Sequence, residues 1–250
     1  MPTLKKILPP IVAIVIILII WQACLIWTPV NGLLLSAPTE IFFALYSNLN
    51  TIIYHCAISL FEATAGLILG ASSAYLLSLL LTLNSTLKNT IYPLAIAFKA
   101  VPVIAVAPLL VLWFGSGCGS KIAVAALLSF FPVLVGSVNG LSDIDRSTRD
   151  YLSSLAISRR TLLLKISIPL SLPQFFTSMK VASSLSIVGA IVGEFTGSSM
   201  GAGYLINTAS YYLQTPLMFA VIVLMSLGSL GLFGAICWLE SKIIYWKLQD

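Results

Sequence analysis

Charge is what this sequence has least of. Only 8% of its 250 residues are Asp, Glu, Lys or Arg, whereas a soluble domain carries about 25%. So few charges cannot cover a water-exposed surface, and apolar residues reach 59% with a mean hydropathy of +1.04. These values exclude a soluble enzyme, a disordered regulator and a secreted disulfide scaffold. They predict an all-α integral membrane protein, with room for about six spans of ~20 residues.

Histidine and cysteine are also scarce. The chain has one histidine, His55, and its four cysteines are scattered as Cys24, Cys56, Cys118 and Cys237, without a C-x-x-C pair. A zinc site needs such groups at close spacing, so no metal is expected. Cys56 and Cys118 both fall near one predicted membrane face, which allows a disulfide, although two free thiols in apolar surroundings are favoured.

A nucleotide-binding loop is missing as well. The nearest string, GSGCGSKI at 115–122, has Ser120 in place of the second glycine and Ile122 in place of Ser or Thr. With one histidine and few acids, the chain supplies no convincing triad or carboxylate pair for catalysis. We therefore expect a non-catalytic protein without a cofactor of its own, driven by a partner or a gradient.

Apolar runs divide the chain into six expected spans. They lie at 7–27, 57–81, 91–114, 121–139, 179–197 and 216–238. Lys5 and Lys6 before the first run also fit a cleaved signal peptide, but the run is long enough to span, so an uncleaved anchor is favoured. The expected organisation is an anchor helix with an external loop over 1–56, a core over 57–240 with a cytoplasmic loop at 140–178, and a tail over 241–250.

The basic residues predict the orientation of these spans. The loops 28–56 and 198–215 contain no Lys or Arg, and Lys121 lies at the edge of the short connection 115–120. In membrane proteins, basic residues concentrate in the cytoplasmic loops. The sequence therefore predicts six helices with both termini inside. The inside set comprises Lys5, Lys6, Lys88, Arg146, Arg149, Arg159, Arg160, Lys165, Lys180, Lys242 and Lys247.

Three charges fall within the expected spans: Glu62, Lys99 and Glu194. A charge at a helix centre costs at least ~2.5–3.5 kcal/mol, so each is a candidate functional residue. Lys99 could attract an anion, pair with a neighbour or extend to the interface. For Glu194 we favour a structural or gating contact over direct substrate binding.

Proline and glycine give further packing signals. The third span contains Pro93, Pro102 and Pro108, which predict a broken helix along a pathway wall. The spacing G-x-x-x-G, which lets helix backbones approach closely, occurs in three of the expected spans. These pairs are Gly66/Gly70, Gly136/Gly140 and Gly189/Gly193, and span six adds Gly228, Gly231 and Gly234.

The segment 140–180 is the longest polar stretch on the inner side. Apolar residues recur in it at helical spacing, which predicts an amphipathic docking element at the membrane face. Ser158 is expected to cap a helix that starts at Arg159. Pro169 and Pro173 are expected to break the chain before span five.

This segment resembles the cytoplasmic EAA loop of ABC-importer permeases of the binding-protein-dependent type. The stretch DYLSSLAIS at 150–158 and IPLSLP at 168–173 carry the match, with Asp150 in place of the family's Glu and Ala156 in place of its Gly. Around it, KAVPVIAVAPLLVLWFG at 99–115, VGEF at 192–195 and GAGYL at 201–205 are similar to motifs of the nitrate/sulfonate/taurine branch. The resemblance covers about residues 57–235.

The resemblance implies a complete importer around this chain. Two permeases, as a homodimer, would form the membrane core in a bacterial cytoplasmic membrane, with a binding protein outside and a cytoplasmic ATPase that holds ATP and Mg²⁺. The substrate would be a small, anionic solute such as a sulfonate, taurine or nitrate, or else a pyrimidine or riboflavin-type vitamin precursor. The implied ATPase contacts are Asp150, Tyr151, Leu155, Ala156, Ser158 and Arg159, and the implied pathway residues are Lys99, Pro102, Pro108 and Glu194.

Two other classes of protein fit parts of the sequence. An ion-coupled carrier or channel would need no ATPase, but it would carry more polar residues along its spans than these three buried charges. A membrane-anchored assembly or sensor protein would explain a docking loop, but not the proline-rich third span.

Overall fold

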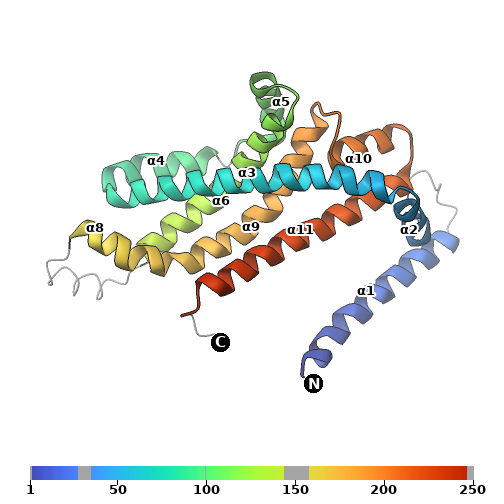
Figure 1. Cartoon of the computed structure of the whole chain (residues 1–250), viewed down its shortest axis with the longest axis horizontal. Coiled ribbons are helices and arrows are strands. Elements are labelled where there is room, and N and C mark those ends of the chain that lie inside the picture. Colours follow the sequence, from blue (N-terminus) through green and yellow to red (C-terminus); the bar gives the residue numbers. More distant parts are fainter. Residues whose placement is uncertain (1, 28–34, 99, 144–157, 247–250) are drawn as a thin grey trace.

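The computed structural model of the chain describes residues 2–27, 35–98, 100–143 and 158–246, and all regular structure in these ranges is helical (Figure 1). Lys99, Asp150, Tyr151, Leu155 and Ala156 lie outside the described residues. The helices are α1 (Pro2–Trp27), α2 (Pro38–Ser47), α3 (Leu49–Leu83), α4 (Ser85–Phe98), α5 (Val103–Phe114), α6 (Cys118–Ser142), α8 (Arg159–Leu162), the π-helix η1 (Leu163–Ser167), α9 (Ile168–Phe195), α10 (Ala202–Tyr211) and α11 (Thr215–Ile243).

Four of the described helical segments are long and apolar enough to cross a membrane. They are α3, α6, the η1–α9 segment Leu163–Phe195, and α11, and the bent pair α4–α5 makes a fifth if it counts as one span. In α1 the apolar stretch Ile11–Ile26 is shorter. The predicted all-α membrane architecture is therefore confirmed, while six spans with both termini inside stay a prediction.

The third predicted span is a broken helix, as its prolines indicated. α4 ends at Phe98 and α5 begins at Val103, and their axes differ by 99°. Pro102 is the extended N-cap residue of α5, where its missing N–H removes no helical hydrogen bond. Pro108 lies inside α5, and both prolines are exposed.

The expected break at Pro169 and Pro173 is wrong. Residues 159–195 follow one helical path through α8, η1 and α9, with Pro169 in the first turn of α9 and Pro173 inside it. The N–H of Ile168 bonds five residues back, to the carbonyl of Leu163. This π turn widens the helix immediately before Pro169, and such local adjustments let membrane helices accommodate proline.

The centre of the molecule is the three-helix contact of α3, α6 and α9 (Figure 1). Each predicted G-x-x-x-G pair lies in it. Gly66 and Gly70 face α6, where an added Cβ would overlap Ala125 and Ala126, and a Cβ at Gly189 of α9 would lie 2.7 Å from the Cα of Ala125. The pair on α6 meets α9 in the same way, at Ser178 for Gly136 and at Ser171 and Gln174 for Gly140. Small residues therefore set the spacing of all three helices.

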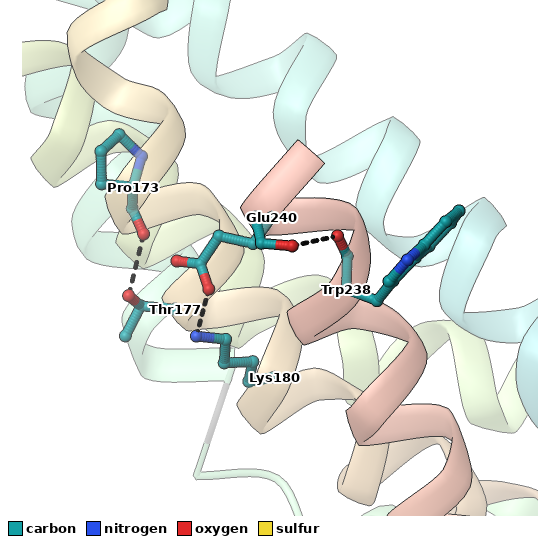
Figure 2. A network of polar contacts seen from close by, with 6 residues as sticks. Pro173, Thr177, Lys180, Trp238 and Glu240 are labelled. Atoms are coloured by element: carbon teal, nitrogen blue, oxygen red, sulfur yellow. Dashed lines mark hydrogen bonds and ion pairs between the residues drawn. The ribbon is translucent and has the colours of Figure 1, made fainter. Parts of the chain in front are cut away.

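An ion pair joins α11 to α9 at the opposite end from α10 (Figures 1 and 2). The ammonium of Lys180 lies 2.5 Å from the carboxylate of Glu240, and both side chains are about three-quarters buried. Figure 2 also shows the hydroxyl of Thr177 donating to the carbonyl of Pro173, at 2.8 Å, one turn away on α9. A charge on each helix is thus neutralised by the other helix rather than by water.

We expect Gly189→Ala to lower the free energy of unfolding by about 1–3 kcal/mol, because the added Cβ must push apart the backbones of α6 and α9. The matched control is Gly231→Ala on α11, where the Cβ meets open space and helix propensity rises. Thermal unfolding of the purified protein in lipid nanodiscs measures both. Equal midpoints for the two variants would contradict the close-packing account.

For the ion pair, Lys180→Met and Glu240→Leu are each expected to destabilise the protein by about 1–3 kcal/mol, because each leaves a largely buried charge unpaired. The double variant should recover most of that loss, since it leaves no charge behind. A double-mutant cycle of unfolding free energies measures the coupling. Strict additivity of the two single effects would show that the pair contributes nothing to the packing of α11.

Candidate functional site

Glu194, a pathway candidate from the sequence, lies in the last turn of α9 and is 2% exposed. Its carboxylate accepts a hydrogen bond from the hydroxyl of Ser59 on α3 and another, at 2.5 Å, from the N–H of Gly203 in α10. The residue therefore ties three helices together. Both hydrogen bonds join the carboxylate to groups on other helices of the chain.

Side chains from α3 and α9 cap three successive N–H groups at the beginning of α10. The N–H of Gly201 donates to Nδ1 of His55 at 3.0 Å, and the N–H of Ala202 donates to the hydroxyl oxygen of Ser59 at 2.7 Å. The first N–H groups of a helix have no partner within it. Here three in succession are satisfied, by His55, Ser59 and Glu194.

Two glycines allow the carboxylate to come this close to the backbone. Gly201 has φ +104°, a conformation that side chains rarely adopt, and a Cβ on it would overlap the carboxylate of Glu194. A Cβ on Gly203 would lie 2.8 Å from Oε2 of Glu194. The glycines of the sequence GAGYL thus leave room for the carboxylate of Glu194 beside the backbone of α10.

Lys121 and Glu62 complete what we call the Glu194 cluster: His55, Ser59, Glu62, Lys121 and Glu194. Lys121 is 1% exposed, and its ammonium donates to the carbonyls of Ser116, of Gly117 at 3.0 Å and of Gly197 at 3.2 Å. Glu62 is 3% exposed and lies near enough to Glu194 and Lys121 to interact with both. Its Oε2 has no hydrogen-bond partner in the described part of the chain.

Sequence reasoning missed His55 and Ser59 as members of this cluster, although a signal was present. His55, Ser59 and Glu62 recur at i, i+4 and i+7, which places them on one face of α3. In an otherwise apolar helix, a polar stripe at that spacing indicates a polar partner. The partner could not be named from the sequence, because it is the backbone of α10.

Beside the cluster lies a cavity of about 400 Å³ between the end of α9 and the outer face of α10. We call it the α10 pocket. Its lining includes Glu194, Ser198, Tyr204, Asn207, Tyr211 and Tyr212. The ring of Tyr204 also lies against the ring of His55, with centroids 5.8 Å apart, so the pocket and the cluster share a wall.

At the other end of the bundle, the predicted cap at Ser158 is confirmed. The N–H of Thr161 donates to the hydroxyl oxygen of Ser158 at 3.2 Å, and α8 begins at Arg159. A cavity of about 500 Å³ adjoins this end, where Lys88 donates to Ser142 at 2.8 Å. Ser158 and Arg159 are the only predicted ATPase contacts within the described ranges.

The other predicted pathway residues do not belong to the Glu194 cluster, and Lys99 lies outside the described residues. Pro102 and Pro108 lie on α5, which packs against α6 and α9. Within the described residues, no disulfide joins any two of Cys24, Cys56, Cys118 and Cys237. Within the described ranges, no three His, Cys, Asp or Glu residues are grouped so that they could hold a metal ion.

Comparison with solved structures relates the fold to a transporter. A crystal structure of an amino acid ABC transporter with histidines superimposes with a TM-score of 0.60 at 13% identity, covering 80% of this chain and 98% of that one. At this identity the likeness concerns the fold alone.

Sequence relatives agree with it. The chain is 33% identical over 240 residues to a probable ABC transporter permease protein of Haemophilus influenzae, covering 96% of this chain and 98% of that protein. It is 34% identical over 247 residues to the formylaminopyrimidine transport permease protein ThiX of Halalkalibacterium halodurans, covering 97% of both. It is 28% identical to the putative aliphatic sulfonates transport permease protein SsuC of Bacillus subtilis, covering 93% of this chain and 85% of that protein.

The family profile of the binding-protein-dependent transport system inner membrane component matches residues 64–245. This range includes α6, α9, α10 and α11 in full and most of α3. Of the Glu194 cluster it contains Lys121 and Glu194, whereas His55, Ser59 and Glu62 precede it. The resemblance inferred from the loop and its flanking motifs is confirmed, and the chain belongs to this family of ABC transporter permeases.

Proposed function

We propose that this chain is the non-catalytic membrane subunit of an ATP-driven importer of a small organic solute. A cytoplasmic ATPase would bind ATP and Mg²⁺, a binding protein outside would deliver the solute, and a second copy of the chain would complete the pathway in a bacterial cytoplasmic membrane. Family membership and the permease names of the full-length relatives support this assignment.

The observation that carries the proposal is the continuous helical path from Arg159 to Phe195 (Figure 1). At about 1.5 Å per residue it is roughly 50 Å long, enough to cross a bilayer. It begins where the coupling segment 150–158 ends, and it ends at Glu194, which caps α10. A displacement at the ATPase end would therefore be transmitted to the α10 end by one rigid element.

We propose six spans with both termini inside, counting α1 as the first and the α4–α5 pair as the third. The one-sided distribution of basic residues supports this orientation. Aromatic side chains support the position of the last span. Tyr211 and Tyr212 stand exposed before α11, and Tyr245 and Trp246 after it, as expected of residues at the two membrane interfaces.

Within this assembly, we assign ATPase contact to Asp150, Tyr151, Leu155, Ala156, Ser158 and Arg159. We assign the pathway to the region of Lys99, Pro102, Pro108 and Glu194. The break between α4 and α5 supports the second assignment, because irregular backbone at membrane depth is tolerated where it is buried or lines a cavity.

Two substrate classes are consistent with the family. An anionic solute was suggested by Lys99 and has a parallel in the sulfonate permease SsuC, at 28% identity. A vitamin precursor has a parallel in the formylaminopyrimidine permease ThiX, which is more similar, at 34% identity over nearly the whole of both chains.

Co-purification tests the assignment as a permease subunit. We expect the wild-type chain, co-expressed with the ATPase encoded beside it, to retain that ATPase, and Leu155→Asp to release it, because a charge disrupts an apolar docking surface. Leu213→Asp, an equivalent change at an exposed site before α11, is the control. Failure of the folded wild-type chain to retain any ATPase, with solute-dependent ion flux through the chain alone, would favour an ion-coupled carrier instead.

Loss of the Glu194 carboxylate should free the start of α10. In Glu194→Ala, we expect amide hydrogen exchange over residues 201–205 to rise about tenfold or more, because the buried N–H of Gly203 loses its acceptor. Solute-stimulated ATPase activity should fall while basal activity persists. The control is Ser184→Ala, an exposed position on the same helix. Unchanged exchange in Glu194→Ala would show that the carboxylate does not hold α10.

A further inference from the structure

One of the three groups that cap α10 can accept a hydrogen bond in only one of its protonation states. Nδ1 of His55 accepts the N–H of Gly201 at 3.0 Å. A neutral imidazole has one ring nitrogen without a proton, whereas both nitrogens of the protonated ring are donors. The contact therefore requires a neutral His55 whose proton is on Nε2.

The other two capping groups do not share this restriction. The hydroxyl oxygen of Ser59 accepts the N–H of Ala202 at 2.7 Å, and the carboxylate of Glu194 accepts the N–H of Gly203 at 2.5 Å. A serine hydroxyl always keeps its acceptor lone pairs, and a carboxyl group keeps acceptor capacity even when it is protonated. Only at His55 does the binding of one proton remove the acceptor.

His55 lies close to water at one end of the bundle. It is in the second turn of α3, and its side chain is partly exposed. With 35 residues at about 1.5 Å each, α3 is roughly 50 Å long, whereas the hydrocarbon core of a bilayer is about 30 Å thick. Since the expected span begins at residue 57, most of the excess length lies around His55, where protons can reach the ring.

A protonated His55 would gain no ion pair in the described part of the chain. No carboxylate there is paired with it, and its ring contacts are with Tyr54 at 5.3 Å and Tyr204 at 5.8 Å between centroids. Protonation would therefore remove the bond to Gly201 without an ionic replacement from these residues. The titratable and charged groups on the elements around the ring are Tyr54, Cys56 and Glu62 on α3, Tyr204 on α10, Glu194 on α9 and Lys121 on α6.

We propose that the cap of α10 is a pH switch, closed when His55 is neutral and open when its ring binds a proton. A proton on Nδ1 would face the N–H of Gly201, so two donors would meet and the buried N–H would lose its acceptor. Histidine is suited to this role, because its ordinary titration lies between about pH 5 and pH 8. The switch is a property of the chain itself, whereas its place on the outer side and its effect on transport rest on the proposed importer function.

Amide hydrogen exchange tests the switch in the purified full-length chain in nanodiscs. Protection over residues 201–205 is measured at about pH 8 and about pH 5, after correction for the pH dependence of intrinsic exchange. We expect protection in the wild type to fall about tenfold at the acidic pH, because a buried N–H loses its acceptor. Exchange over α11 is the internal control for global unfolding.

Two substitutions separate the acceptor from the titration. In His55→Asn, the amide oxygen stands near the position of Nδ1 and does not titrate, so protection should stay high at both pH values. In His55→Leu there is no acceptor, so protection should be about tenfold lower at both.

The titration of the ring itself can be followed in the same sample. The sequence contains one histidine, so isotope-labelled histidine reports on His55 alone when the affinity tag contains none. We expect the NMR signal of the ring and the loss of protection over residues 201–205 to change at the same pH.

Four results would overturn the inference. They are protection in the wild type that does not change with pH, the same pH dependence in His55→Asn, high protection in His55→Leu, or a ring that titrates at a different pH from the cap. The outcome is independent of the co-purification experiment. Retention of the ATPase without a pH-dependent cap would refute the switch alone, whereas a pH-dependent cap in a chain that retains no ATPase would leave the switch and refute the importer assignment.

Discussion

The close approach of α3, α6 and α9 is the constraint on which the rest of the structure depends. Apolar side chains gain little by leaving lipid for a protein interior, so these helices associate through shape and short contacts. Glycine at 66, 70 and 189 removes the atoms that would hold the backbones apart. The same spacing brings Ser59, Lys121 and Glu194 from three different helices to one end of the bundle, and the site exists only because of it.

The buried charges in this site are neutralised mainly by backbone. Glu194 accepts from the N–H of Gly203 in the first turn of α10, and Lys121 donates to carbonyls before α6 and after α9. Helix termini supply such partial charges at fixed positions. A charge held by backbone is tied to the position of a whole helix, so a movement of α9 must either carry α10 with it or expose a buried carboxylate.

Much of the fold could be predicted from the sequence, because its signals are local. Hydropathy predicted the apolar helices α3, α6, α9 and α11, proline spacing predicted the break before Val103, and G-x-x-x-G spacing predicted close helix contacts. The cost of burying charge singled out Glu194 but gave no partner, since an N–H of α10 has no signature in the sequence. The helix through Pro169 was missed for a related reason: the π turn at Leu163–Ser167 adjusts hydrogen bonding, which residue preferences do not encode.

The continuous helix from Arg159 to Phe195 connects the segment that we assign to ATPase contact with the Glu194 cluster. At its start, an N-cap at Ser158 orders the helix immediately after the segment that we assign to ATPase contact. At its far end, Glu194 accepts from the N–H of Gly203 in α10 and borders the α10 pocket. A rigid connection transmits displacement but cannot by itself discriminate solutes. Discrimination would require groups that contact the solute directly, and the described lining of the α10 pocket contains tyrosine rings, the amide of Asn207 and the hydroxyls of Ser198 and Thr208.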